Sequence, residues 1–240
     1  MSAAPGHNHR DNRILAALPD GMLSTMERDL RQVVLAPGTT IFEPGDPVEQ
    51  IYFPQSGIIS LLVVTAHGGT VEISTIGREG ALGLHRALGE RRSFTRAIAQ
   101  VAGYFSIITA ARFERIINDN QSVHDLILRY TELLWAEAQQ TAACNAVHDA
   151  SSRLCRWLLQ TSDRLESDML PLTQEFLSQM LGVRRTTLTL LAQALQTKGA
   201  IRYTRGKIKI VDRAALETSA CECYRVIRQD TLPPRIGVSL

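Results

Sequence analysis

The segment from Pro171 to Asp212 constrains the fold of this chain more than any other part of the sequence. Its hydrophobic spacing predicts two short helices separated by a turn at Gly182, where a residue with positive φ is easiest to accommodate. Thr173 directly precedes the first apolar run and is placed to cap the first helix. Gly199 ends the second helix, and two β-rich runs follow it. The segment therefore predicts a helix-turn-helix followed by a small β-hairpin wing.

The second predicted helix opens with Arg184, Arg185 and Thr186. Guanidinium groups and hydroxyls at the exposed start of a helix are suited to reading guanine edges and holding phosphates in a DNA major groove. The hairpin has a cationic tip, which adds phosphate-binding capacity. These features favour a DNA-binding module over a plain helical pair. The residues expected at the interface are Thr173, Gln174, Arg184, Arg185, Thr186, Thr189, Arg205 and Lys207.

The distribution of charge supports the same interpretation. The region from Pro171 to Arg228 holds ten Lys and Arg against four Asp and Glu, a net charge of +6. Because the whole chain carries +2, the rest of it carries −4. A basic C-terminal module on a mildly acidic body is the electrostatic pattern of a nucleic-acid-binding protein, although a solvated basic face alone would give the same count.

Length and composition bound the class of protein. A chain of 240 residues with 45% hydrophobic residues is long enough for two ordinary domains with real cores. It contains no apolar run long enough to span a membrane and no signal-peptide segment at its start, so we expect a cytoplasmic protein. Four cysteines fit free thiols in a reducing compartment. Cys221 and Cys223 are separated by one residue and lack a second pair with metal-ligand spacing, so no metal site is expected.

The N-terminal half has the sequence pattern of an antiparallel β unit. Gly, Pro and Asp signals separate many short apolar runs, which favours a closed or sandwiched sheet such as a β-roll or jelly roll. A glycine-bearing segment near Gly80 interrupts the strands, and it is either an anion-binding turn or an ordinary bulged connection. The expected strands are Arg31–Leu35, Thr40–Phe42, Gln50–Phe53, Gly57–Val64, Thr70–Ile76, Phe94–Val101 and Tyr104–Ile108.

A long helical pattern follows, from about Ala110 to Ala146. Its apolar residues recur in alternating threes and fours, which suits a helix packing along a partner helix. We expect this stripe to form a dimer interface, and the alternative is a core helix of the β domain. A further helix is expected over Ser151–Ser162. The stripe residues are Val123, Ile127, Tyr130, Leu134 and Thr141.

The predicted fold class is α+β, with an N-terminal antiparallel β-roll or jelly roll, a long dimerisation helix and a C-terminal winged helix-turn-helix. The expected parts are residues 1–29 as a tail with a short helix, 30–110 as the β-roll, 111–147 as the dimerisation helix, 148–228 as the winged helix-turn-helix and 229–240 as a C-terminal tail.

Four motifs in this order give the chain a family resemblance. They are Leu35-Ala-Pro-Gly-x-x-Ile-Phe-Glu-Pro-Gly-Asp, Tyr52-Phe-Pro-x-Ser-Gly, Gly77-Arg-Glu-Gly and Leu172-Thr-Gln-Glu-Phe-Leu-x-Gln-Met-Leu-Gly-Val-Arg-Arg. From about Leu30 to Arg228 the chain resembles the Crp/Fnr transcription regulators. The resemblance implies that Arg185 stands where the family reads guanine. Thr186 stands where cyclic-AMP-type members often carry a glutamate, which implies a different half-site.

The resemblance also implies an altered effector site. The family's cyclic-AMP cassette has the form Gly-Glu-Leu-Gly-Leu, and here Ala81 replaces its ribose-binding carboxylate. Cyclic AMP is therefore not the expected effector, and an unidentified small molecule takes its place. The iron–sulfur members carry N-terminal cysteines, whereas this chain has none before Cys144. The residues of the candidate effector pocket are Gly80, Ala81, Leu82, Gly83, Arg91, Arg92 and Ser93.

The sequence is compatible with three functions. The leading one is a homodimeric transcription regulator, with double-stranded DNA as its partner and RNA polymerase as a further candidate partner. The second is an effector-sensing β-roll protein that acts through protein contacts without reading DNA. The third is a cupin-like metal enzyme, but no nucleophile and base are visible together, and the one His-x-His pair, His7 and His9, lies in the N-terminal tail. No cofactor, catalytic residue or membrane contact is expected.

Overall fold

The structure is a computed structural model that describes residues 8–67, 69–85, 89, 92–118 and 120–229. The chain divides into two compact units. Among the described residues, the first unit comprises 8–60 and 75–134, and the second comprises 61–74 and 135–229. Each unit is built around its own set of buried apolar side chains. None of the helices in these ranges combines the length and apolar character needed to cross a bilayer.

The described residues before the first strand contain more helix than the one short helix expected. They form a 3-10 helix, η1 (His9–Asp11), and two α-helices, α1 (Arg13–Ala17) and α2 (Asp20–Glu27). The fully buried Asn12 starts α1, because its Oδ1 accepts from the N–H groups of the second and third helical residues. Its Nδ2 donates to the carbonyls of Pro54 and Gly80 at 2.9 and 2.8 Å. The apolar residues of α1 and α2 join the core, which explains the difference from the prediction.

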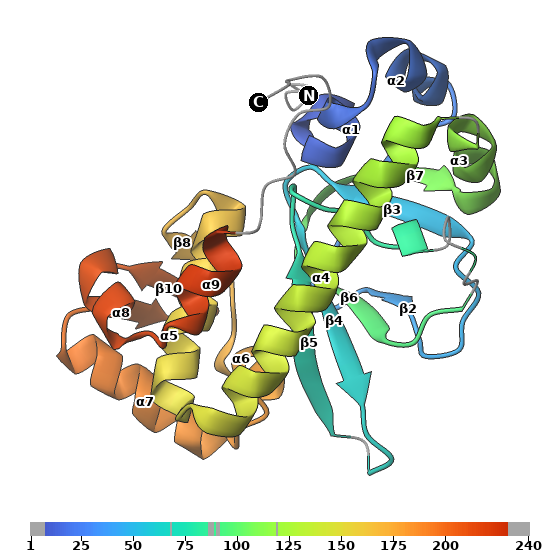
Figure 1. The fold of residues 1–240 in the computed structure, drawn as a ribbon. Helices are drawn as coiled ribbons and strands as arrows, with labels where there is room; N and C mark the ends of the chain where they lie inside the picture. Colours follow the sequence, from blue (N-terminus) through green and yellow to red (C-terminus); the bar gives the residue numbers. More distant parts are fainter. Residues whose placement is uncertain (1–7, 68, 86–88, 90–91, 119, 230–240) are drawn as a thin grey trace. The chain divides into compact units, whose positions relative to one another are not determined.

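All seven predicted strands are present, so the α+β class with an N-terminal antiparallel β unit is confirmed (Figure 1). One sheet has the order β1-β7-β3 and the other β2-β6-β4-β5. In the first sheet both neighbours run antiparallel to β7, with Arg31 and Tyr52 both opposite Ile107. The strands are β1 (Arg31–Leu35), β2 (Thr40–Phe42), β3 (Gln50–Pro54), β4 (Ile58–Val64), β5 (Thr70–Ile76), β6 (Arg96–Val101) and β7 (Gly103–Thr109).

Two helices replace the single helix expected from Ala110 to Ala146. These are α3 (Ala110–Ile117) and α4 (Gln121–Val147). Asn118 caps the end of α3, and the Asn120 side chain accepts from the backbone N–H of Val123 at 3.1 Å at the start of α4. Asparagine competes for backbone hydrogen bonds and so favours a helix start over a helix interior. The expected dimerisation helix therefore begins about ten residues later than the pattern indicated.

The first half of α4 packs against its own chain. Val123, Ile127 and Tyr130 are 0%, 1% and 7% exposed, and they belong to the core cluster that also contains Phe53 and Phe113. These three residues were expected at a dimer interface, but their apolar surface is already buried within the unit. The alternative of a core helix is therefore correct for this half of α4. Leu134 is half-buried and Thr141 is buried.

The second unit contains the C-terminal helices and a small sheet. Helix α5 (Ala150–Leu165) confirms the helix expected over Ser151–Ser162, and Asp149 caps it through the N–H groups of Ser151 and Ser152. A strand that the sequence did not predict, β8 (Met169–Leu170), completes a sheet of order β8-β10-β9. The remaining elements are α6 (Gln174–Leu181), α7 (Arg185–Thr197), β9 (Ile201–Thr204), β10 (Lys207–Ile210), α8 (Arg213–Ser219) and α9 (Cys223–Gln229).

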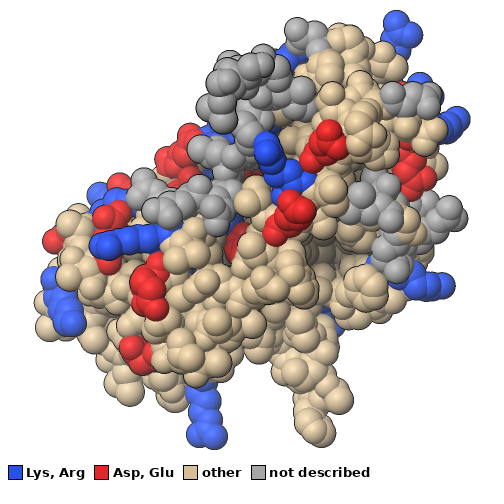
Figure 2. All heavy atoms as spheres, viewed as in Figure 1, with Lys and Arg blue, Asp and Glu red and all other residues tan. Residues whose placement is uncertain are grey.

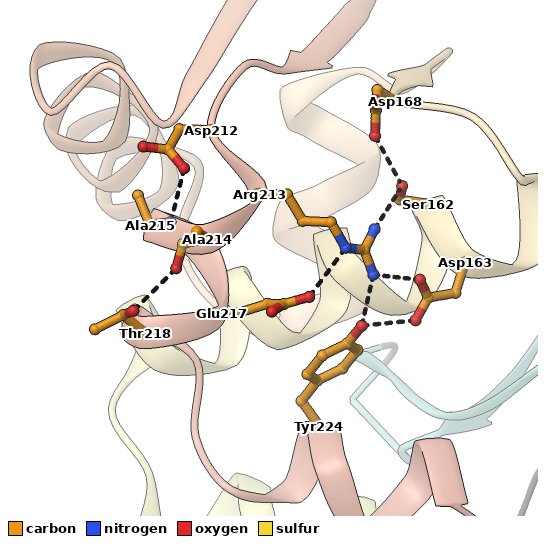
Figure 3. Close-up of polar contacts among 10 residues, drawn as sticks. All are labelled: Ser162, Asp163, Asp168, Asp212, Arg213, Ala214, Ala215, Glu217, Thr218 and Tyr224. Carbon is orange, nitrogen blue, oxygen red and sulfur yellow. Dashed lines mark hydrogen bonds and ion pairs between the residues drawn. The ribbon is translucent and has the colours of Figure 1, made fainter.

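A polar network around Arg213 joins α5, α8 and α9 (Figure 3). The guanidinium pairs with Asp163 and donates to Glu217 Oε1 at 3.0 Å and to Tyr224 Oη at 2.7 Å. Tyr224 in turn donates to the second oxygen of Asp163 at 2.8 Å. Burial alone would lower the pKa of Arg213, but its hydrogen bond and ion pair with Asp163 outweigh burial and raise it. The network therefore favours a charged arginine and fixes α9 against α5 and α8.

Candidate nucleic-acid interface

The first helix of the predicted helix-turn-helix is α6, and its ends are built as the sequence indicated. Thr173 Oγ1 accepts from the N–H of Phe176 at 3.2 Å, which caps the helix. Gly182 ends it with a φ of +63°, a left-handed conformation that other residues adopt only with strain. Leu177 and Met180 are buried beneath it. Thr173 therefore has a structural role in addition to any contact with DNA.

Helix α7 presents a polar start to solvent. Its buried stripe is Leu188, Ala192 and Leu195, at 0%, 4% and 2% exposure. This stripe directs the opposite face outward. Arg184 has extended backbone and precedes the helix as its N-cap, so α7 begins at Arg185 and not at Arg184. The exposed residues at this end are Arg184, Arg185, Thr186 and Thr187.

Two residues of the expected interface contact each other. The Thr189 hydroxyl lies 3.2 Å from Gln174 Oε1 and 3.0 Å from the carbonyl oxygen of Arg185. Both side chains are half-buried. This contact ties the start of α6 to the middle of α7, so Thr189 and Gln174 help to set the angle between the two helices.

One exposed residue on α7 was not among those expected at the interface. Leu190 is 67% exposed and lies one helical turn beyond Thr186 on the same face. An apolar side chain on a helix that enters a major groove can contact the methyl group of thymine. A signal for it was available, because Leu190 falls outside the stripe defined by Leu188, Ala192 and Leu195.

The hairpin places its cations on one face. Lys207 pairs with Thr204 across a turn formed by Arg205 and Gly206, whose φ is +74°. Ile208 is buried, whereas Lys207 and Lys209 are exposed. Lys209 lies directly opposite the exposed Arg202 in the antiparallel register. Like charges in such a pair repel, and an anion between them would remove the repulsion. Arg202 and Lys209 therefore extend the predicted set of phosphate-binding residues.

On the face of the molecule drawn in Figure 2, Lys and Arg side chains project singly from the surface, with Asp and Glu side chains among them. In the C-terminal module the exposed basic residues of α7 and the hairpin are Arg184, Arg185, Arg202, Arg205, Lys207 and Lys209. Such side chains can each reach a different phosphate along a DNA backbone.

The candidate effector segment is tightly packed. Ala81 is 2% exposed and belongs to the hydrophobic core cluster, so its methyl group points where a ribose-binding carboxylate could not be solvated. Leu82 exchanges both backbone hydrogen bonds with Tyr52, at 2.9 and 3.0 Å. Gly83 has a φ of +93°, and a Cβ there would lie 3.0 Å from the carbonyl oxygen of Gln50. A Cβ on Gly80 would lie 2.2 Å from the Tyr130 hydroxyl oxygen.

Among the described residues, the two expected anion-binding side chains, Arg92 and Ser93, both donate to backbone carbonyls. Arg91 lies outside the described residues. Arg92 is exposed and donates to the carbonyl of Gly45 at 2.7 Å. Ser93 is buried, and its hydroxyl donates to the carbonyl of Thr95 at 2.7 Å. These contacts hold Arg92 and Ser93 against neighbouring backbone.

A separate cluster of potential ligands is formed by residues outside the helix-turn-helix. The sulfur atoms of Cys144, Cys221 and Cys223 and a ring nitrogen of His148 all lie within 4.8 Å of one another. Burial raises the pKa of the Cys144 thiol, and it raises that of Cys221 to about 12. No metal-ligand set was expected here from the sequence. The four-residue spacing of Cys144 and His148 was the available signal, because it places both on one face of a helix.

Two family models match the chain. A cyclic nucleotide-binding domain matches residues 32–120, and a Crp-like helix-turn-helix domain matches residues 152–219. The global nitrogen regulator of Nostoc sp. is 25% identical over 181 residues, which are 71% of this chain and 81% of that protein.

Solved structures give the same fold. FixK2 from Bradyrhizobium japonicum superposes with a TM-score of 0.70 at 16% identity, covering 80% of this chain and 98% of that one. A transcriptional regulator of the Crp/Fnr family from Eubacterium rectale gives 0.69 at 17% identity, covering 88% and 99%.

The β unit, the capped helix pair and the hairpin define a DNA-binding transcription regulator of the winged helix-turn-helix class. The chain belongs to the Crp/Fnr family.

Proposed function

We propose that the protein is a homodimer that reads a pseudo-palindromic DNA site through α7. The observation that carries this proposal is the exposed start of α7, where Arg185 and Thr186 face solvent while Leu188 anchors the helix in the core. A helix held in this way can lie in a major groove with its first turn against the base edges. Two-fold symmetry would place a second copy of α7 about one turn of DNA away.

Arg185 is the residue for a bidentate contact to guanine, because it stands in the first turn with an exposed side chain. Leu190, on the same face as Thr186, supplies an apolar contact to a thymine methyl group. The preferred half-site therefore contains a guanine and a thymine that lie close enough together for Arg185 and Leu190 of the same α7 helix to contact both. Arg184, just before the helix, is placed to reach the phosphate backbone.

The hairpin holds phosphates and does not read bases. Arg202 and Lys209 form a like-charged pair across the strands, and Arg205 and Lys207 lie at the turn. Such contacts strengthen binding to any sequence and make it sensitive to salt. Base specificity and backbone affinity are thus assigned to different elements of the module.

The dimer interface is assigned to a face of α4 that the chain leaves exposed. Leu128 and Trp135 are 50% and 65% exposed and lie seven residues apart, with Ala142 exposed seven residues further on. A seven-residue repeat keeps these side chains on one line along a helix that pairs with its copy. This line replaces the predicted stripe, whose Val123, Ile127 and Tyr130 are occupied by the core.

The effector is proposed to be a small molecule other than cyclic AMP. Ala81 offers a buried methyl group where the ribose hydroxyl would need an acceptor, and Tyr130 covers Gly80. RNA polymerase is the natural further partner of a regulator that acts by recruitment, and the cytoplasm is the compartment that holds both.

Selection of bound sequences from random DNA by the full-length protein tests this function. We expect a two-fold symmetric motif with one guanine and one thymine enriched in each half-site. Enrichment of an asymmetric motif would contradict dimeric readout, and no enrichment at all would contradict sequence-specific binding.

A further inference from the structure

We propose that Cys144, His148, Cys221 and Cys223 form a binding site for one thiophilic divalent cation, for which Zn²⁺ is the best match. The four residues come from two parts of the second unit. Cys144 lies in the last turn of α4 and His148 directly follows that helix, whereas Cys221 precedes α9 and Cys223 begins it. The site is distinct from the helix-turn-helix and from the effector segment.

The distances between the potential ligand atoms are those of a mononuclear site. Cys144 Sγ lies 3.5 Å from Cys221 Sγ, and Cys223 Sγ lies 3.7 Å from His148 Nδ1. In a tetrahedral site with Zn–S bonds of about 2.3 Å, neighbouring sulfur atoms are about 3.8 Å apart. All four atoms lie within 4.8 Å of one another, so they can share one ion.

The neighbours of the ligands match the surroundings of a metal-bound histidine. His148 Nε2 lies 3.1 Å from Glu222 Oε1, while Nδ1 faces Cys223. A histidine that donates one ring N–H to a carboxylate keeps the lone pair of its other nitrogen for a metal. Gln140 Nε2 also donates to Cys223 Sγ at 3.0 Å. Hydrogen bonds of this kind orient the ligand atoms before the ion arrives.

A buried arginine would balance the net charge of the site when the metal ion is bound. Arg156 is 4% exposed, and it donates from Nη1 to the neutral Gln160 Oε1 at 2.7 Å. Its Nε has no hydrogen-bond partner among the described residues. The guanidinium is close enough to act electrostatically on Cys144 and Cys221. A dication with three thiolates and a neutral imidazole carries one net negative charge, which would pair with this buried cation.

The ligand set selects the class of metal. Three thiolates and one imidazole in a closed, buried site favour Zn²⁺ over the oxygen-preferring Mg²⁺ and Ca²⁺. Since four protein ligands fill a tetrahedral ion, no position is left for a substrate, and the site is structural. It would join the end of α4 to the start of α9, the helix that Tyr224 also fixes through the Arg213 network.

The test uses the full chain without an affinity tag that binds metal. Protein from zinc-supplemented cells is assayed for metal content by mass spectrometry, and reduced, chelated protein is titrated with Co²⁺. We expect one Zn²⁺ per chain and the visible and sulfur-to-cobalt absorption bands of tetrahedral thiolate coordination. Cys221→Ser and Cys223→Ser should abolish both signals. Cys155→Ser is the matched control, because Cys155 is an equally buried thiol outside the cluster.

A substitution outside the four ligands tests the same site if a cysteine variant does not fold. Glu222 has a 73% exposed side chain, so Glu222→Gln should fold normally and weaken Zn²⁺ affinity by about 10–100-fold. Three outcomes would overturn the proposal: reduced wild-type protein that binds neither Zn²⁺ nor Co²⁺, a native Cys144–Cys221 disulfide found by mass analysis, or an iron–sulfur absorption spectrum.

Discussion

A single methyl group added at Gly80 tests how α4 is held against the β unit. In Gly80→Ala the new Cβ would lie 2.2 Å from the Tyr130 hydroxyl oxygen and 2.7 Å from its ring carbons. Ordinary carbon contacts are about 3.5–4.0 Å, so the ring must move by about an ångström or more. Tyr130 is 7% exposed and packed in the core cluster, so that movement forces other side chains to shift. We expect a loss of about 1–3 kcal/mol in the free energy of unfolding.

A double-mutant cycle separates this clash from a general loss of packing. Tyr130→Ala alone should cost about 3–5 kcal/mol, the range for a large buried aromatic residue. The three atoms nearest to the methyl group added by Gly80→Ala all belong to the Tyr130 ring and hydroxyl, so with the ring absent the double variant should cost about 1–3 kcal/mol less than the sum of the two single variants. Urea unfolding followed by circular dichroism measures all four proteins.

Gly21→Ala is the matched control for the cycle. Gly21 lies in α2, and a Cβ there would meet nothing within 4 Å. This substitution should be neutral or stabilising by about 0.5–1 kcal/mol. If Gly80→Ala proved as harmless as Gly21→Ala, or if the effects at Gly80 and Tyr130 were additive, the close packing of α4 on this segment would be refuted.

Three further predictions concern the cap, the dimer and acid stability. Thr173→Ala should destabilise the helix-turn-helix by about 1 kcal/mol, while Thr173→Ser keeps the hydrogen bond to Phe176 and the stability; equal thermal melts would contradict the cap. Trp135→Glu should give a monomer by light scattering, because it puts a charge on the proposed interface at a site 65% exposed in the single chain; a dimer of unchanged stability would assign the interface elsewhere. Burial lowers the pKa of His9 despite the nearby charge of Glu27, so the folded state binds this proton less readily than the unfolded chain. Stability should therefore fall as the pH drops below about 6.5, and His9→Gln should reduce this slope in chemical unfolding at about pH 5 to 7; an unchanged slope would exclude His9 as its source.

Local patterns were sufficient to predict the strands and the helix-turn-helix. Turn residues at short intervals separate the seven strands of the β unit, and each strand depends mainly on its own sequence. Thr173 and Gly182 likewise act on backbone within a few residues of themselves. Turns and helix caps can therefore be predicted without knowing which other element packs against them. β8 was missed because two residues, Met169 and Leu170, carry too little pattern to detect.

Signals that depend on a distant partner were misassigned or missed. The spacing of Val123, Ile127 and Tyr130 correctly predicts a buried helix face, but periodicity does not identify what covers that face. The cysteine cluster is a similar case, because 77 residues of sequence separate Cys144 from Cys221. The network of Arg213 also depends on Asp163, 50 residues earlier in the chain. Asn120 was a local signal for a helix start, but the long apolar pattern around it led to the prediction of one continuous helix.

Base reading and phosphate holding, the two roles assigned to the DNA-binding module, differ in a measurable way. Arg185→Ala should cost about 1–3 kcal/mol on the selected site and relax the preference at one base pair in each half-site. Lys207→Ala should weaken selected and random DNA alike, and it should reduce the salt dependence of binding by about one ion per contact removed. Both side chains are exposed, so neither change should affect folding.

The most direct test of the central claim is therefore one binding matrix. The wild-type protein and the Arg185→Ala and Lys207→Ala variants are titrated against selected and randomised duplexes at several salt concentrations by fluorescence anisotropy. We expect loss of specificity with Arg185→Ala and a uniform loss of affinity with Lys207→Ala. Reversed effects would contradict the assigned roles, and DNA binding unaffected by either variant would contradict recognition through α7 and the hairpin.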